Sequence, residues 1–193
     1  MTRRAPLPRD ALRADLPAIS AIHAAGWRET HARHVPRAYL DGALGHDTRR
    51  LWRRVFAQMA PGRFVLLADG DGTARGFACV LPGRPATLAA LYVVRPARRR
   101  GVARALLRET ARRLGAQGTP GLALAVLADN EGARRFYTAL GARETGSARA
   151  TLPGGTQARV CRMAWTDVAA MADEHPSGAG LPARGGVPRC GRR

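Results

Sequence analysis

The sequence contains no lysine, and all 32 of its basic residues are arginine. A Walker-type phosphate loop, a Schiff base and pyridoxal phosphate chemistry each need a lysine, so the sequence excludes all of them. The arginines give a formal net charge of +18, but they are dispersed along the chain, and such a surface attracts polyanions only electrostatically. The charge alone therefore predicts no specific nucleic-acid partner.

Cysteine and long apolar runs are also scarce. The three cysteines, Cys79, Cys161 and Cys190, form no Cys-x-x-Cys pair, and this usage predicts reduced thiols and a cytoplasmic protein. No apolar run approaches the roughly 18 residues of a transmembrane helix, and the N-terminus lacks the apolar stretch of a signal peptide. We therefore expect no membrane association and no export.

The length of 193 residues and the hydrophobic content of 46% suit one compact domain. Strand-like and helix-like segments alternate, which predicts an α/β fold with a mixed sheet. Among the helices, the first is expected to be capped by Asp15, the second to start at Pro36, and the third to be capped by Asp47 or Thr48.

Glycine-rich segments divide the remaining chain. Residues 69–72 and 153–155 each join two strand-like runs and predict tight hairpins. Beyond residue 167 the composition changes to Gly, Pro, Ala and Arg, and such a segment buries too little apolar surface to offset its ordering entropy. We therefore predict a folded domain over residues 1–166 and a disordered tail over residues 167–193.

Residues 98–103 follow an apolar run and open a helix. A glycine at this point, Gly101, lets a ligand approach the free N–H groups of the first helical turn, where the helix dipole also favours negative charge. The three preceding arginines add positive charge, and Ala103 keeps a second position of close approach small. These features predict a phosphate site, although an ordinary strand-to-helix turn would use similar residues.

A second block follows the apolar run at residues 122–127. Its pattern is Asn130-x-x-Ala133-x-x-Phe136-Tyr137-x-x-Leu140-Gly141. Together with Arg98-x-x-Gly101-x-Ala103, it resembles the two signatures of the GNAT superfamily of acyl-CoA-dependent N-acetyltransferases, and the resemblance covers about residues 6 to 166. A dinucleotide site is not supported, because no Gly-x-Gly-x-x-Gly opens the helix and no acidic residue ends the 122–127 strand.

The resemblance implies a fold and an acyl donor. The expected fold is α/β, with a mixed, largely antiparallel sheet of about six to seven strands whose fourth and fifth strands splay apart, flanked by helices. The donor is acetyl-CoA, without a metal. The resemblance assigns it to the following residues: Tyr92, Val93, Val94, Arg98, Arg99, Arg100, Gly101, Val102, Ala103, Arg104 and Asn130.

Tyr137 is the catalytic residue that the resemblance implies. Acetyl transfer from a thioester needs an attacking neutral amine, a group that holds the oxyanion, and a proton for the departing thiolate. By resemblance, Tyr137 supplies that proton as a general acid. On spacing alone, it would instead be a core aromatic beside Phe136.

The acceptor side is less determined. The resemblance places substrate contacts at Trp27, Glu29 and Tyr39, and Glu29, His31, His34 and Asp41 are candidate bases in the same region. Relatives carry a glutamate at positions that match Thr87 and Ala125, neither of which can act as a base. The spacing of His31 and His34 also fits a metal pair, but no third ligand is evident, so surface histidines are the preferred interpretation. Trp27 either lines a substrate cavity or packs the helices.

Three classes of function follow from the sequence. The leading one is an N-acetyltransferase that transfers acetyl from acetyl-CoA to a primary amine of a small molecule, by direct attack in a ternary complex. A protein N-terminus is the alternative acceptor. A non-catalytic acyl-CoA-binding regulatory module and a polyanion-binding protein are the other two classes, and a homodimer is one option for assembly.

Overall fold

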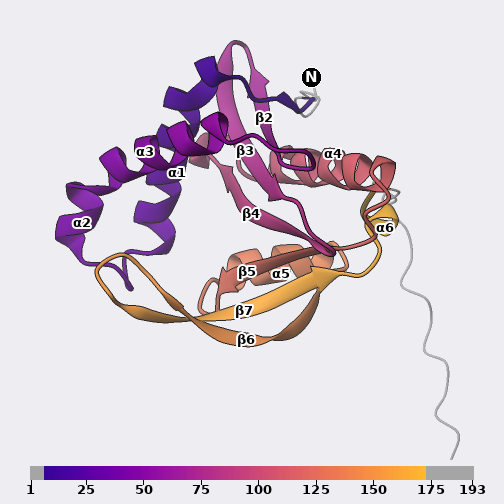
Figure 1. The fold of residues 1–193 in the computed structure, drawn as a ribbon. Helices are drawn as coiled ribbons and strands as arrows, with labels where there is room; N and C mark the ends of the chain where they lie inside the picture. Colours follow the sequence, from indigo (N-terminus) through magenta and orange to yellow (C-terminus); the bar gives the residue numbers. More distant parts are fainter. Residues whose placement is uncertain (1–6, 173–193) are drawn as a thin grey trace, which may run out of the picture.

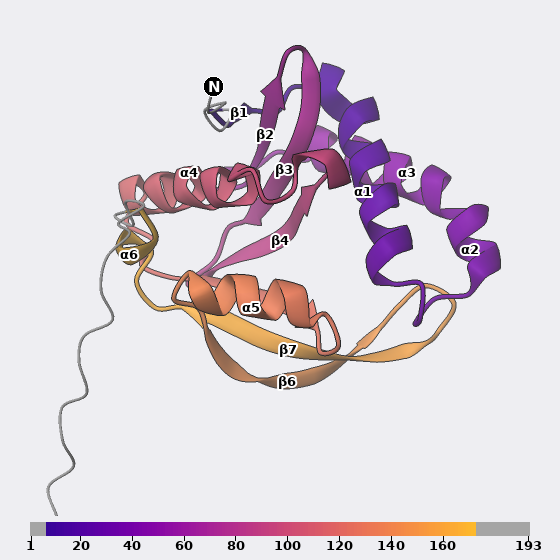
Figure 2. The same cartoon turned by 180° about the vertical axis from the view of Figure 1, so that it is seen from behind.

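The computed structural model describes residues 7–172, which form a single mixed sheet flanked by helices on both faces (Figures 1 and 2). The seven strands lie in the order β1-β2-β3-β4-β5-β7-β6. Only β4 and β5 pair in parallel, while the other neighbours are antiparallel. The strands are β1 (Arg9–Asp10), β2 (Phe64–Gly70), β3 (Thr73–Leu81), β4 (Ala86–Val93), β5 (Leu122–Leu127), β6 (Arg143–Thr151) and β7 (Gln157–Trp165). This architecture confirms the predicted fold class.

Helices connect and cover the strands. The helices are α1 (Leu16–Thr30), α2 (Arg37–Asp41), α3 (Leu44–Ala57), α4 (Val102–Ala116), α5 (Glu131–Ala139) and α6 (Ala169–Ala172), with short 3₁₀ turns η1 (Arg13–Asp15) and η2 (Arg95–Ala97). Figure 2 shows α4 and α5 in front of the sheet, whereas α1 and α3 lie on the opposite face. The sheet is therefore the middle one of three layers.

Alternation along the central strands builds a separate core on each face. In β2, Leu66 and Ala68 pack with α4, while Val65 and Leu67 pack with α1 and α3. Successive side chains of a strand point to opposite faces, so an apolar run such as residues 64–68 can supply both cores. The larger core lies on the α4 and α5 face.

The parallel pairing of β4 with β5 is very short. It joins only Ala86 with Leu122 and Thr87 with Ala123. Immediately beyond these pairs, the register between β3 and β4 shifts, because Val80 faces Leu88 and Cys79 faces Ala90. Ala89 is thus an extra residue in β4, and a bulge of this kind bends its strand. The two strands diverge from this point, which confirms the predicted splay.

The predicted hairpin at residues 69–72 is confirmed. Asp71 and Gly72 have φ angles of +56° and +72°. Positive φ at both central positions defines a type I′ turn, whose twist matches that of the flanking strands, and Asp-Gly is a favoured pair there.

The first helix starts where predicted, with Asp15 at the N-cap position, but the predicted side-chain cap is absent, and the predicted start of the third helix is wrong. Asp15 does not cap α1 with its side chain, because its carboxylate accepts from the Leu12 N–H at 2.7 Å and pairs with Arg9 at 2.8 Å. The third helix starts at Leu44, so Asp47 and Thr48 lie inside it, and the Thr48 hydroxyl donates to Leu44 O. The three side chains predicted as possible caps, Asp15, Asp47 and Thr48, each make another hydrogen bond instead.

The folded domain continues past the predicted boundary at residue 166. Val168 and Met171 are buried in the core on the α4 face, and α6 packs against α4. The prediction of disorder is therefore corrected for residues 167–172, and the rest of the predicted tail lies outside the described residues. Within residues 7–172, no helix is long and apolar enough to cross a membrane.

Replacement of Met171 by alanine should destabilise the protein. Met171 is 8% exposed, and its truncation should cost about 2 kcal/mol through lost burial and a residual cavity. Met59 is 46% exposed, so Met59→Ala is the matched control and should stay within about 0.5 kcal/mol of the parent. Chemical denaturation measures both, and equal stabilities would show that α6 does not dock.

Candidate functional site

The turn before α4 is built to present backbone N–H groups. Gly101 precedes the helix with a φ of +80°, and Arg99 also has a positive φ, of +60°. A left-handed residue followed by helical residues turns successive N–H groups toward one concave spot, which binds anions. The first N–H groups of α4 lack partners within the helix and point the same way. The backbone of this turn is therefore suited to an anion, and the phosphate site stays a prediction.

The Arg98 side chain is bonded to other protein groups and is not free to bind phosphate. Its Nε donates to Val93 O at 3.0 Å, and its Nη2 lies 2.5 Å from Glu29 Oε2. Arg95 lies 3.9 Å from the same carboxylate. Glu29, which the sequence assigned to the acceptor, is thus engaged by the arginines of the turn. Arg99 and Arg100 are exposed and supply the positive charge beside Gly101.

The backbone of β4 presents the N–H of Val93, which within residues 7–172 has no partner in a neighbouring strand, to the gap between β4 and β5. The Val94 N–H donates to Arg75 O, toward β3, at 2.9 Å. Backbone groups of successive strand residues point to opposite sides, so the N–H and C=O of Val93 face the gap. Of the three predicted residues Tyr92, Val93 and Val94, Val93 is therefore the one whose N–H can meet a ligand there.

Asn130 and Tyr137 come from the segment after β5. The Asn130 side chain caps α5 by accepting from Ala133 N–H at 3.1 Å, which leaves its NH₂ group to donate. Tyr137 is 9% exposed, and its ring packs edge-on against Trp165 with centroids 5.9 Å apart. Burial, followed by the nearby Tyr92 phenol, raises the pKa of Tyr137 above its ordinary value. The hydroxyl is therefore fully protonated at neutral pH.

Tyr92 lies on the other face of the sheet, against α1. A Cβ on Gly26 would lie 2.2 Å from Tyr92 Cδ1, so the ring covers this glycine directly. The ring centroid is 4.9 Å from that of His23 and 5.7 Å from that of Phe77. Burial raises the pKa of Tyr92 to about 12, against a smaller opposing effect of a hydrogen bond with the Trp27 side chain. Trp27 thus packs the helix and also reaches β4.

His23 is a buried, neutral histidine with a fixed tautomer. Trp52 Nε1, which can only donate, bonds to His23 Nδ1 at 3.0 Å. Burial, followed by the charge of His31, lowers the pKa of His23 to about 4. Its single proton therefore lies on Nε2, so His23 can donate at that atom but cannot accept.

The loop after α1 connects to the loop after β5. His34 Nε2 lies 2.8 Å from Asp129 Oδ2, although the two residues are far apart in the sequence. His31 stacks on Trp27 with ring centroids 4.1 Å apart and an interplanar angle of 9°. Both histidines are half-buried and engaged, which corrects their interpretation as surface residues. Among residues 7–172, no group of three or more His, Cys, Asp or Glu side chains is placed to hold a metal ion.

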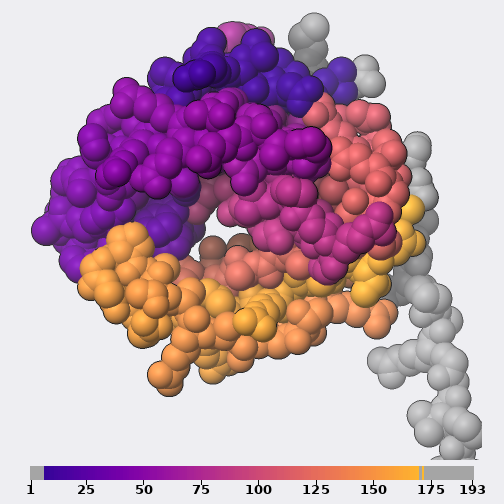
Figure 3. Space-filling model, in the orientation of Figure 1, coloured from indigo at the N-terminus to yellow at the C-terminus, as the bar shows by residue number. Residues whose placement is uncertain are grey.

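The turn between β6 and β7 completes a ring around the gap. Leu152 packs in a cluster with Val35 and Leu40, and a Cβ on Gly154 would lie 3.1 Å from Pro36 Cδ. Figure 3 shows the resulting opening, rimmed by the violet N-terminal helices, the magenta β3 and β4 segment and the orange β6–β7 hairpin. The opening is enclosed on all sides of this view.

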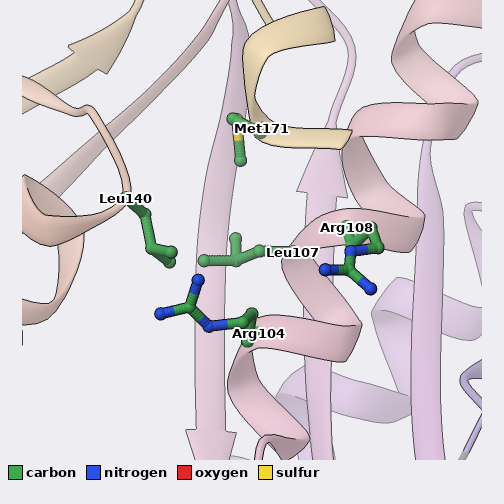
Figure 4. A pocket seen from close by; sticks show the side chains of 5 residues that line it. All are labelled: Arg104, Leu107, Arg108, Leu140 and Met171. Atoms are coloured by element: carbon green, nitrogen blue, oxygen red, sulfur yellow. The ribbon is translucent and has the colours of Figure 1, made fainter. Parts of the chain in front are cut away.

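Two predicted residues lie elsewhere. The Tyr39 hydroxyl donates to Asp47 Oδ2 at 3.1 Å, and its ring packs in the cluster around Val35. Arg104 lines a small hollow between α4, α5 and α6, and Figure 4 shows its guanidinium extended toward Leu140. The structure therefore gathers Gly101, Val93 and Asn130 beside the splayed strands, but it places Tyr39 in helix packing and Arg104 at a separate hollow.

Comparison with known proteins identifies the family. The family described as Acetyltransferase (GNAT) matches residues 22–142. This chain belongs to the GNAT acetyltransferase family. The match runs from within α1 to just past α5, including both signature segments and the splayed strands. No curated protein sequence matches the acetyltransferase.

Solved structures share its fold. A GCN5-related N-acetyltransferase from Rhodopseudomonas palustris has a TM-score of 0.69 at 21% identity, covering 86% of this chain and 98% of its own. YncA from Salmonella typhimurium, solved with acetyl-CoA, has a TM-score of 0.65 at 21% identity and covers 92% and 100%. A ribosomal-protein-alanine N-acetyltransferase from Brucella melitensis has a TM-score of 0.62 at 25% identity and covers 83% and 99%.

Sequence reasoning missed three contacts of this acetyltransferase: the pair of Glu29 with Arg98, the pair of His34 with Asp129, and the seat of Tyr92 on Gly26. The glycine inside an otherwise good helical pattern was the one available signal, because such a glycine often marks a close approach. The two ion pairs join residues whose proximity depends on the whole fold.

Gly26→Ala should destabilise the acetyltransferase by about 1–2 kcal/mol, because the added methyl group would displace the Tyr92 ring from its packing. Gly115→Ala, in α4, is the matched control. A Cβ there meets nothing within 4 Å, so this variant should gain up to about 1 kcal/mol of helix propensity. Urea denaturation measures both, and a stabilised Gly26→Ala would show that Tyr92 is not fixed by this contact.

Proposed function

We propose that this acetyltransferase transfers acetyl from acetyl-CoA to the primary amine of a small molecule by direct attack in a ternary complex. The observation that carries this proposal is the enclosed opening between β4 and β5, with Tyr137 on the α5 side and the side chains of α1 on the other. We will call the turn at Gly101 the donor turn. An acetyl-CoA thioester in that opening would have the donor turn on one side and the acceptor amine on the other.

The donor assignment is supported by the turn at Gly101 and by relatives. The concave N–H groups and the adjacent Arg99 and Arg100 suit the pyrophosphate of acetyl-CoA. YncA was solved with acetyl-CoA, and PaiA from Thermoplasma acidophilum with coenzyme A. From that turn, a pantetheine arm would run along the free edge of β4 past Val93, within reach of the Asn130 NH₂.

The proposed chemistry needs three groups. The amine nitrogen attacks the thioester carbon, and the oxyanion that forms is held by the Val93 N–H. The carbon–sulfur bond then breaks, and the sulfur takes a proton from the Tyr137 hydroxyl. The attacking nitrogen releases one proton to solvent and Tyr137 takes one proton back from solvent, so the products are an amide, the free thiol of CoA and an unchanged enzyme.

The small acceptor is supported by the closed rim. The contacts of His34 with Asp129 and of the β6–β7 turn with Pro36 enclose the acceptor side rather than leaving an open groove. A protein N-terminus is the second candidate acceptor, since the Brucella melitensis relative carries a ribosomal-protein name. A non-catalytic acyl-CoA sensor is the third reading, because Thr87 and Ala125 stand at the positions of family carboxylates.

These alternatives separate in simple assays. A thermal shift that is larger with acetyl-CoA or CoA than with buffer tests donor binding, and thiol release over a panel of amines and N-terminal peptides tests transfer. Thiol release with peptides alone would favour the protein acceptor. Donor binding without release on any acceptor would favour the sensor.

Gly101→Glu should abolish acetyl-CoA binding while the protein stays folded. The carboxylate would occupy phosphate space and repel the phosphates. Gly118→Glu is the matched control, since its φ of +63° imposes similar backbone strain away from the turn and a Cβ there meets nothing within 4 Å. Titration calorimetry measures both affinities, and a Gly101→Glu variant with parental affinity would rule out this phosphate site.

Tyr137→Phe should lower kcat by on the order of 100-fold and leave acetyl-CoA affinity nearly unchanged, because the ring still packs while the proton donor is lost. The loss should shrink with an acetyl thioester of a more acidic thiol, whose thiolate needs less protonation. Steady-state kinetics with both donors measures this. A kcat within about twofold of the parent for both donors would make Tyr137 a packing residue.

A further inference from the structure

The hydrogen bonds around His31 fix which of its nitrogens carries the proton. The Thr30 hydroxyl lies 2.8 Å from Gly26 O and 2.7 Å from His31 Nδ1. A hydroxyl has one hydrogen, and a carbonyl oxygen can only accept, so the hydrogen of Thr30 is used at Gly26. His31 Nδ1 must then be the donor to Thr30, and Nε2 carries a lone pair.

The charge state of His31 agrees with this assignment. Burial, followed by the charge of His34, lowers the pKa of His31 to about 4, against smaller opposing effects of Asp129 and the Trp27 carbonyl. The ring is therefore neutral at neutral pH. His31 and His23 are both neutral, but they have opposite tautomers, so of these two only His31 offers an acceptor at Nε2.

His31 lies between residues that contact β4 on one side and the loop after β5 on the other. Its ring stacks on Trp27, whose side chain reaches the Tyr92 hydroxyl on β4. On the other side it is close to His34 and Asp129, which join the loops after α1 and β5. The Trp27 and His31 rings thus lie between Tyr92 on β4 and the pair of His34 with Asp129. Among residues 7–172, the hydrogen bond of the His31 ring to another side chain is made at Nδ1, and the residue is half-buried rather than enclosed.

The nearby carboxylates do not compete with His31 Nε2 for a hydrogen bond from the acceptor amine. Glu29 is paired with Arg98 and Asp129 with His34, and Thr87 and Ala125 are not acidic. An amine that enters the opening from the α1 side therefore meets aromatic faces and one neutral nitrogen lone pair.

We propose that Nε2 of His31 accepts a hydrogen bond from the acceptor amine and orients it, while Trp27 packs against the amine's carbon skeleton. Thr30 is the positioning residue that holds His31 in the accepting tautomer. The inference rests on the proposed function and names the group that binds its second substrate.

The tautomer can be read by NMR in isotope-labelled protein with CoA bound. We expect His31 to carry its proton on Nδ1 and His23 to carry its proton on Nε2. Titration with benzylamine or alaninamide, the probes for a small amine and for an N-terminus, should shift the His31 Nε2 resonance and leave the exposed His46 unchanged. A His31 ring protonated at Nε2, or an Nε2 resonance that neither probe moves, overturns the proposal.

Variants then test what the lone pair contributes. His31→Phe keeps a flat ring on Trp27 but removes both nitrogens, and we expect the dissociation constant for benzylamine to rise about tenfold, with CoA affinity unchanged. His31→Gln retains an acceptor near the same place and should restore part of the affinity. His46→Phe is the matched control. An unchanged benzylamine affinity in His31→Phe overturns the proposal.

Thr30 gives an independent readout. Thr30→Val removes the hydroxyl at nearly constant shape and should mix the two tautomers of His31, whereas Thr30→Ser should keep the parental spectrum. Absence of thiol release from acetyl-CoA with all amines, together with the expected His31 titration, would count against the proposed function and leave this site intact. Thr30→Val with the parental tautomer would remove Thr30 from its role.

Discussion

The site depends on one interruption of the sheet, the extra residue Ala89 in β4. Before it, β4 and β5 are paired through Ala86 and Thr87; after it, β4 bends away and no longer meets its parallel neighbour. An interior strand that loses its neighbour leaves backbone groups unpaired, and such groups are costly unless something else bonds to them. The unpaired backbone at Val93 on the free edge of β4 is therefore destabilising by itself, and it is also the reason that a ligand can bind there.

Arg98 links the two sides of this edge. Its guanidinium satisfies Val93 O from one direction and Glu29 on α1 from the other, at 3.0 and 2.5 Å. One side chain therefore connects the turn before α4 with helix α1, which carries Glu29. Because this arginine is committed to a carboxylate and a carbonyl, the proposed phosphate site depends on the exposed Arg99 and Arg100 and on backbone N–H groups.

Local patterns were sufficient for most of the architecture. The apolar run at residues 122–127 coincides with β5, and α4 begins at Val102, where residues 98–103 were predicted to open a helix. The bulge at Ala89 had no sequence signal, because residues 88–90 read as an ordinary strand. The pairs of Glu29 with Arg98 and of His34 with Asp129 were equally hidden, since they join elements that only the tertiary fold brings together.

Tyr92, Tyr137, His23 and His31 are neutral at neutral pH, and this constrains how an amine can react beside them. Tyr92 and Tyr137 keep their phenolic protons, and His23 and His31 stay neutral with one ring proton each, because burial penalises the charged form of each. An ammonium ion would have to give up its hydration without gaining an unpaired carboxylate, whereas a free amine would lose little. The same surroundings suit a transition state in which charge is spread between nitrogen, oxygen and sulfur. The proposed reaction therefore selects the deprotonated amine, and the acidity of the acceptor, rather than that of Tyr92, Tyr137, His23 or His31, sets how the rate rises with pH.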